Sequence, residues 1–176
     1  MRMLLAFFFS SAFPLSATIG VVDDIRTMTQ KSGVIVEVQV ISQRVTLDEK
    51  GRIITLSKLR VKDGLKGADT GQELTLYQVG GEYQGRVMRL QGASVYRSGE
   101  KLMLFAVPYQ DKMIVSYGLG LGKFNISQKK NGDQVIEDIH GLQVLQMKAG
   151  LRTLSEPSPR KYRSLEAFKA EIRRAL

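Results

Sequence analysis

The sequence predicts a mainly β protein: a small antiparallel OB-like barrel with a short N-terminal helix and a C-terminal helix. Apolar and polar residues alternate with a period of two along most of the chain, which is typical of half-buried strands. Glycine-bearing turns separate these segments, and helical periodicity occurs only near the two ends. Closure into a barrel is favoured because it removes exposed strand edges, while a β-sandwich is the alternative arrangement.

The clearest strand signal begins at Val34. Four valines at every second position up to Val40 form one apolar face, and β-branched residues favour strands. A glycine-containing turn at residues 48–51 predicts that residues 52–61 return as the second strand of a hairpin. The other expected strands, the last two of them joined by an Asn131-Gly132 turn, cover residues 72–79, 86–91, 101–107, 113–117, 123–127 and 135–139.

Helical signals flank this β block. Asp23 and Asp24 are suitable N-caps for a short helix before the first strand. Ser164 can cap an amphipathic helix at residues 164–176, in which apolar residues recur at intervals of three and four. The preceding residues 148–163 are basic and contain two prolines, which indicates a linker between the barrel and this helix.

The N-terminal segment predicts export. Arg2 supplies a positive charge, residues 3–9 form an apolar run, and small residues lead up to Ala17. Serines and a proline interrupt the apolar run well before the roughly 20 residues that a membrane span needs. We therefore expect residues 1–17 to be a removable signal peptide, residues 18–147 to form the barrel domain, and the protein to be periplasmic or secreted.

Composition limits the classes of partner. The chain has no cysteine, which excludes a disulfide framework and a lipidated cysteine. The formal net charge is +9, and residues 148–176 hold eight basic and three acidic residues. Such a segment can contact anionic lipid or polysaccharide, and a merely solvated basic surface is the alternative interpretation.

Nucleic-acid binding is not expected. Single-strand binding on an OB-type barrel depends on aromatic side chains that stack on bases. Beyond the signal segment, no aromatic residue precedes Tyr77, so the first two expected strands lack a stacking platform. The glycine-rich residues 118–123 also fail the phosphate-loop pattern, because Phe124 stands where serine or threonine is required. A bulge or sharp bend between two strands is the favoured interpretation of these glycines.

No catalytic constellation is evident, and we expect no cofactor and no metal. His140 is the single histidine, so a histidine-rich zinc site is excluded. Asp138 lies two residues before it, but no serine nucleophile motif accompanies the pair. Glu137 and Asp138 would face opposite sides of a strand, which is poor geometry for paired-carboxylate chemistry.

One loop has the character of a binding surface. Adjacent glycines let the backbone approach a partner closely, and the polar residues that follow offer mixed recognition. The alternative is a simple strand connection whose glycines serve only backbone geometry. The predicted binding residues are Gly80, Gly81, Glu82, Tyr83 and Arg86.

A resemblance to a known family is carried by short, glycine-based motifs in residues 23–127: Gly51-Arg52-Ile53-Ile54-Thr55, Gly64-Leu65-Lys66-Gly67, Gly80-Gly81-Glu82 and Gly120-Leu121-Gly122-Lys123-Phe124. Their order resembles a group of exported bacterial β-barrel domains that occur alone or beside matrixin-like zinc protease domains. The chain is also distantly similar to netrin-like modules, OB-type barrels that include tissue inhibitors of metalloproteinases. Those inhibitors hold the catalytic zinc through an N-terminal cysteine, which this chain lacks.

These observations predict an exported, non-enzymatic binding or accessory module that acts on a protein or envelope partner. The alternative is a role associated with hydrolysis. In that case the protein regulates an extracytoplasmic protease, or is itself a weak hydrolase that uses scattered carboxylates and His140.

Overall fold

The computed structural model describes residues 19–20, 23–129, 132–138, 143–148, 151–155, 158–162 and 164–176. The predicted signal peptide and His140 lie outside these residues. Within them the protein is mainly β, with one short α-helix near each end of the chain.

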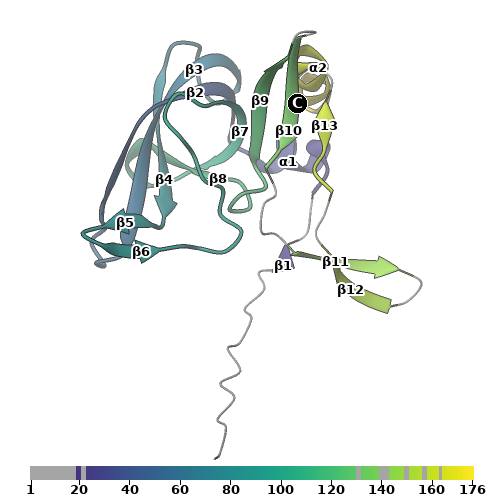
Figure 1. Cartoon of the computed structure of the whole chain (residues 1–176). Coiled ribbons are helices and arrows are strands. Elements are labelled where there is room, and N and C mark those ends of the chain that lie inside the picture. Colours follow the sequence, from purple (N-terminus) through teal and green to yellow (C-terminus); the bar gives the residue numbers. More distant parts are fainter. Residues whose placement is uncertain are drawn as a thin grey trace, which may run out of the picture.

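Five strands close into a barrel (Figure 1). The predicted OB-like barrel is therefore confirmed. Every pairing in its wall is antiparallel except the one between β4 and β8, which is parallel and spans only two register positions. Around the barrel the strands follow the order β2 (Val34–Leu47), β3 (Ile53–Lys66), β4 (Glu73–Val79), β8 (Met113–Ser116) and β7 (Lys101–Pro108).

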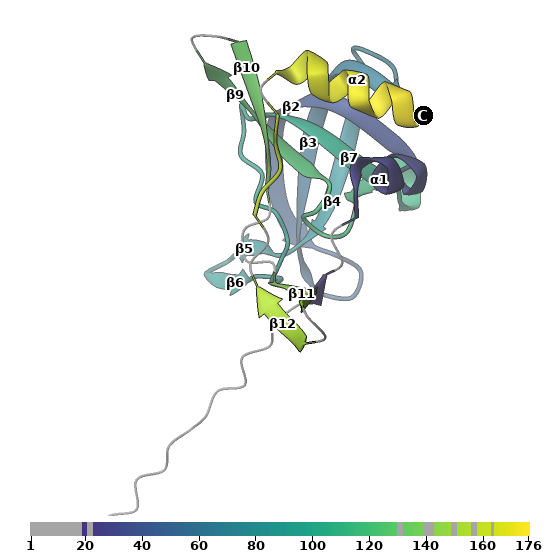
Figure 2. The ribbon, with the colours of Figure 1, turned by 90° about the vertical axis from the view of Figure 1, so that its right-hand side faces the viewer.

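The sheet continues beyond the barrel at β7. There it gains β9 (Lys123–Lys129), β10 (Gly132–Glu137) and β13 (Lys161–Tyr162). Register pairing of Lys129 with Gly132 confirms the predicted hairpin between β9 and β10, although Asn131 itself lies outside the described residues. Figure 2 shows α1 (Ile25–Lys31) and α2 (Leu165–Ala175) against one side of this sheet.

Both helices begin where the sequence predicts. The Asp24 carboxylate accepts a hydrogen bond from the Thr27 amide at 2.7 Å, and the Ser164 hydroxyl accepts one from the Ala167 amide at 3.1 Å. Each cap satisfies an amide that has no partner within its helix.

Two hydrophobic cores share β2 and β7. Val36 and Leu104 point into the barrel, while Ile35 and Phe105 point out of it into a second core formed with the helices. The interpretation of residues 34–40 as a half-buried strand is therefore incomplete, because Ile35 is fully buried as well. Strands buried on both faces carry continuous apolar runs, as β2 does at residues 34–36 and β7 does at residues 102–107.

The segment expected to be a linker, residues 148–163, contains two strands. β12 (Leu151–Ser155) pairs with β11 (Gln143–Lys148), which also pairs with β1 (Ile19–Gly20) in a small separate sheet. The second is β13, which pairs with β10. The domain boundary expected at residue 147 thus falls inside β11.

The C-terminal helix belongs to the main fold. Phe168 and Ile172 of α2 are fully buried in the second core. Lys169 is buried as well, and its Nζ lies 2.6 Å from a Glu37 oxygen and 2.8 Å from an Asp63 oxygen. Burial opposes its charge, but hydrogen bonds to Asp63 and Glu37 outweigh burial and raise the pKa of Lys169. Part of the basic charge of the C-terminal segment is therefore neutralised within the fold.

Neither helix among the described residues is long and apolar enough to cross a membrane.

Replacing Phe168 with alanine tests whether α2 is part of the core. The Phe168 ring packs against Phe124 and Tyr162 with centroid distances of 4.8 and 4.3 Å. We expect Phe168→Ala to lower the free energy of unfolding by about 3–5 kcal/mol in urea denaturation, because it opens a cavity. The control Leu176→Ala, at a residue 58% exposed, should change it by less than about 0.5 kcal/mol. Equal effects would contradict the placement of α2.

Candidate functional site

The predicted binding residues lie on a two-stranded hairpin, β5 (Gly81–Tyr83) and β6 (Arg86–Met88). Glu82 and Arg86 are exposed, Tyr83 and Gly81 are half-buried, and Gly80 is buried. The structure thus brings the five residues together, with two polar side chains directed to solvent.

The adjacent glycines of this hairpin are explained by packing against the barrel. Gly80 and Gly81 have φ angles of +112° and +136°, which favour glycine. A Cβ atom on Gly81 would lie 2.7 Å from Thr55 Oγ1 and 2.9 Å from Val45 Cγ1. The Thr55 hydroxyl also donates a 2.7 Å hydrogen bond to the Gly80 carbonyl. Gly81 therefore serves the contact with β2 and β3, whereas a Cβ atom on Gly80 would lie 2.9 Å from the Met88 carbonyl oxygen of β6.

The acidic residues considered for catalysis are held in ion pairs. Glu137 is buried and accepts a 2.9 Å hydrogen bond from Arg160 Nε. Asp138 is buried with an oxygen 3.1 Å from Lys123 Nζ. His140 lies outside the described residues, and within them no group of three or more histidine, cysteine or acidic residues is arranged to hold a metal.

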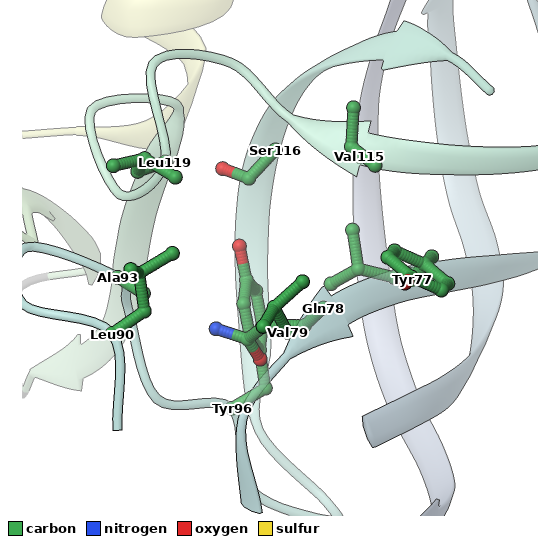
Figure 3. Close-up of a pocket in the computed structure, with 10 residues that line it drawn as sticks. Tyr77, Gln78, Val79, Leu90, Ala93, Tyr96, Val115, Ser116 and Leu119 are labelled. Atoms are coloured by element: carbon green, nitrogen blue, oxygen red, sulfur yellow. The ribbon is translucent and has the colours of Figure 1, made fainter. Parts of the chain in front are cut away.

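A pocket of about 110 Å³ lies where the barrel wall divides. β4 and β8 pair only at Thr75 with Met113 and at Leu76 with Ile114, and the next residues of both strands line the two sides of the pocket (Figure 3). We call it the seam pocket. Its ten lining residues are Leu76, Tyr77, Gln78, Val79, Leu90, Ala93, Tyr96, Val115, Ser116 and Leu119.

None of these ten side chains carries a charge at neutral pH. Two of the polar ones are already engaged: the Gln78 amide donates to the Ser94 carbonyl, and the Tyr77 hydroxyl donates to Asp48 at 3.3 Å. The lining groups that are buried without a hydrogen-bond partner among the described residues are the hydroxyls of Tyr96 and Ser116.

These two hydroxyls are buried without a hydrogen-bond partner among the described residues. Tyr96 is only 3% exposed, and Figure 3 shows its hydroxyl pointing toward Ser116. They lie close together but lack hydrogen-bond geometry. Burial raises the pKa of Tyr96 and outweighs the opposing effect of Ser116, so the phenol stays neutral. A buried hydroxyl without a partner costs about 1–3 kcal/mol, which makes such a pair uncommon.

Lys123 holds in place the connection between β6 and β7, residues 89–100, which carries Tyr96. Its side chain is 1% exposed, and its Nζ donates to the Val95 carbonyl at 2.6 Å and contacts Glu100 at 2.8 Å. The same ammonium lies 4.9 Å from the centroid of the Tyr96 ring, a cation–π distance. Together with Asp138, these contacts hold the inner wall of the seam pocket in place.

The glycine-rich residues 118–123 bring a second loop against this connection. A Cβ atom on Gly120 would lie 2.6 Å from the Gly92 carbonyl oxygen, and Ser94 Oγ donates to the Gly120 carbonyl at 3.2 Å. Leu119, with a φ of +66°, adopts a conformation that is unusual for a bulky residue. These glycines permit close backbone approach in a bend, as the sequence indicates.

The mouth of the seam pocket is apolar. Leu90 and Leu119 line it and remain 42% and 41% exposed, respectively. The hairpin of β5 and β6 leaves the pocket wall at Val79 and returns just before Leu90, so both of its ends lie at the pocket. The predicted loop is therefore close in the chain to a site that the sequence did not identify.

The pocket residues escaped sequence reasoning because they come from three separate stretches without a motif. The signal that could have pointed to them is Tyr96, an aromatic residue with a polar tip inside a polar, glycine-bearing connection.

Comparison with models of known protein families and with curated proteins found no match to this chain. The resemblance to exported bacterial barrel domains and to netrin-like modules stays a prediction.

Alanine substitutions in the hairpin separate two reasons for its glycines, the positive φ angle and the close contact with β2 and β3. Gly81→Ala should lower the free energy of unfolding by about 2–4 kcal/mol, because it adds steric overlap to an unfavourable φ. The matched control Gly85→Ala has a φ of +76° but open space around the new methyl group, so about 1–2 kcal/mol is expected. Urea denaturation measures both. An equal loss would show that the contact of Gly81 with β2 and β3 has no energetic role.

Removing the buried ammonium should destabilise the protein strongly. Lys123→Met leaves Glu100 and Asp138 without this cation, so we expect a loss of about 3–5 kcal/mol in the free energy of unfolding. Lys58→Met is the control, because the Lys58–Glu73 pair is largely exposed and should contribute less than about 1 kcal/mol. A loss at position 123 no larger than that at position 58 would contradict the anchoring role of Lys123.

Proposed function

We propose that this protein is a non-enzymatic binding module, exported to the periplasm or secreted, that receives a group of a protein or envelope partner in the seam pocket. The observation that carries the proposal is the pair of buried, unpartnered hydroxyls of Tyr96 and Ser116 on the wall of an otherwise apolar pocket. Ligand sites in proteins have this composition: mostly apolar walls with a few converging polar groups.

The chemistry of the lining favours binding over hydrolysis. A general base must accept a proton near neutral pH, and the raised pKa of Tyr96 keeps its hydroxyl protonated there. Ser116 would need an adjacent base to act as a nucleophile, and the ten lining residues include no histidine, carboxylate or lysine. The same side chains are well suited to hydrogen bonding with a bound group.

The walls of the pocket are built from paired and anchored segments. Two sides are barrel strands, and the third is the connection anchored by Lys123. Binding to such a site requires little ordering of the protein, which favours affinity. This rigidity supports a role in recognition.

The surroundings of the mouth fit a macromolecular partner. Leu90 and Leu119 would form the apolar centre of the contact, and Glu82 and Arg86 on the adjoining hairpin would supply polar contacts at its edge. Protein interfaces combine an apolar centre with a polar rim in this way. The predicted binding residues thereby keep a secondary part in the proposal.

Site-specific photo-crosslinking tests the proposal. A photoreactive amino acid at Leu90, in the full-length protein expressed in its native envelope, should give a discrete product with one partner. The matched control is Ile41 on β2, which is 39% exposed against 42% for Leu90 but does not line the pocket. The Leu90 product should disappear in the Ala93→Leu variant, which fills the pocket, provided that circular dichroism shows an unchanged fold. Absence of a product at Leu90, or an equal product at Ile41, would contradict the proposal.

A further inference from the structure

We infer that the seam pocket binds a compact, uncharged, mainly apolar group that carries a single hydrogen-bonding oxygen, for which a phenol is a matched probe. The inference rests on the proposed function and names the chemistry of the group that enters the site.

The size of the pocket sets the size of the group. A closed apolar cavity of about 150 Å³ accommodates benzene, and the seam pocket offers about 110 Å³ with an open mouth. One six-membered ring fits if a substituent on its far side extends past Leu90 and Leu119. A larger ring system would extend out of the mouth or displace lining side chains.

The absence of charge in the lining sets the charge of the group. A buried ion is stable only when it is paired, and none of the ten lining side chains can pair with one. The nearest buried cation, Lys123, lies against the Tyr96 ring and is engaged by Glu100 and Asp138. A carboxylate or an amine placed at the hydroxyl pair should therefore be rejected.

The hydroxyls of Tyr96 and Ser116 set the number and position of the polar atoms in the bound group. Each can donate and accept a hydrogen bond. One ligand hydroxyl placed between Tyr96 and Ser116 can donate to one and accept from the other, so that both buried groups gain a partner. Since the Gln78 amide nitrogen and the Tyr77 hydroxyl already donate elsewhere, a single ligand oxygen is best placed at the hydroxyl pair.

A trapped water could also satisfy the hydroxyls, but it would leave the apolar side chains of Leu76, Val79 and Val115 poorly covered. A phenol meets both demands, because its ring covers these side chains while its oxygen reaches the hydroxyl pair.

The experiment titrates the ¹⁵N-labelled full-length protein with p-cresol, toluene and 4-methylbenzoate at pH 7 and follows amide chemical shifts. We expect saturable p-cresol binding with shifts at Tyr96 and Ser116, toluene binding at least about threefold weaker, and no binding of 4-methylbenzoate at the same site. Tyr96→Phe and Ser116→Ala should each weaken p-cresol about two- to tenfold and leave the affinity for toluene unchanged.

The variants also provide an internal control on folding. Among the described residues the Tyr96 hydroxyl has no partner of full hydrogen-bond geometry, so Tyr96→Phe should change the free energy of unfolding in urea by less than about 1 kcal/mol. A loss of p-cresol binding in this variant then reports on the ligand contact alone.

Four results would overturn the inference: no saturable p-cresol binding, equal affinity for p-cresol and toluene, equal affinity for p-cresol and 4-methylbenzoate, or wild-type p-cresol affinity in both hydroxyl variants. A water-filled pocket predicts the first of these. Failure here is distinguishable from failure of the proposed function. A Leu90 crosslink without p-cresol binding refutes only the ligand class, whereas p-cresol binding without a crosslink refutes only the macromolecular partner.

Discussion

The buried ammonium group of Lys123 joins the separate parts of this protein. It lies on β9, outside the barrel, yet it contacts Glu100, Asp138 and the Val95 carbonyl and faces the ring of Tyr96 inside the barrel. A buried ammonium is stable only when carboxylates and hydrogen-bond acceptors surround it. Burial of this ammonium therefore requires one arrangement, in which β9, the connection after the β5–β6 hairpin and the barrel core meet. That arrangement places Tyr96 at the seam.

The seam itself follows from how the barrel closes. Four of the five strand pairings in the wall are antiparallel, and the β4–β8 pairing is parallel and ends after Leu76 and Ile114. Beyond this pairing the wall is formed by side chains and loops. They do not fill the gap between β4 and β8, and the seam pocket remains there. Barrel mouths and gaps of this kind are common places for ligand sites. The two orphaned hydroxyls give this gap a chemical character that packing alone does not require.

Local patterning predicted the barrel well, because alternation and turns are local properties of the chain. Burial of Ile35 on the second face of β2 was not predicted, because it depends on helices distant in sequence. The same holds for β13, which pairs with the distant β10 inside a segment where proline and charge suggested a linker. In contrast, β12 pairs with β11 directly before it, so its hairpin is local and was hidden by the basic, proline-bearing composition of residues 148–163. The seam pocket escaped prediction since each of its segments is ordinary alone, and the glycines at positions 80 and 81 were more visible although they serve packing.

The central claim is that the Tyr96 and Ser116 hydroxyls face a ligand. The most direct measurement is a crystal structure of the protein with bound p-cresol. We predict the p-cresol oxygen within hydrogen-bond distance of both hydroxyls, with its methyl group directed to the mouth between Leu90 and Leu119. A pocket that contains only water, or a ring bound with its oxygen pointing outward, would contradict the account.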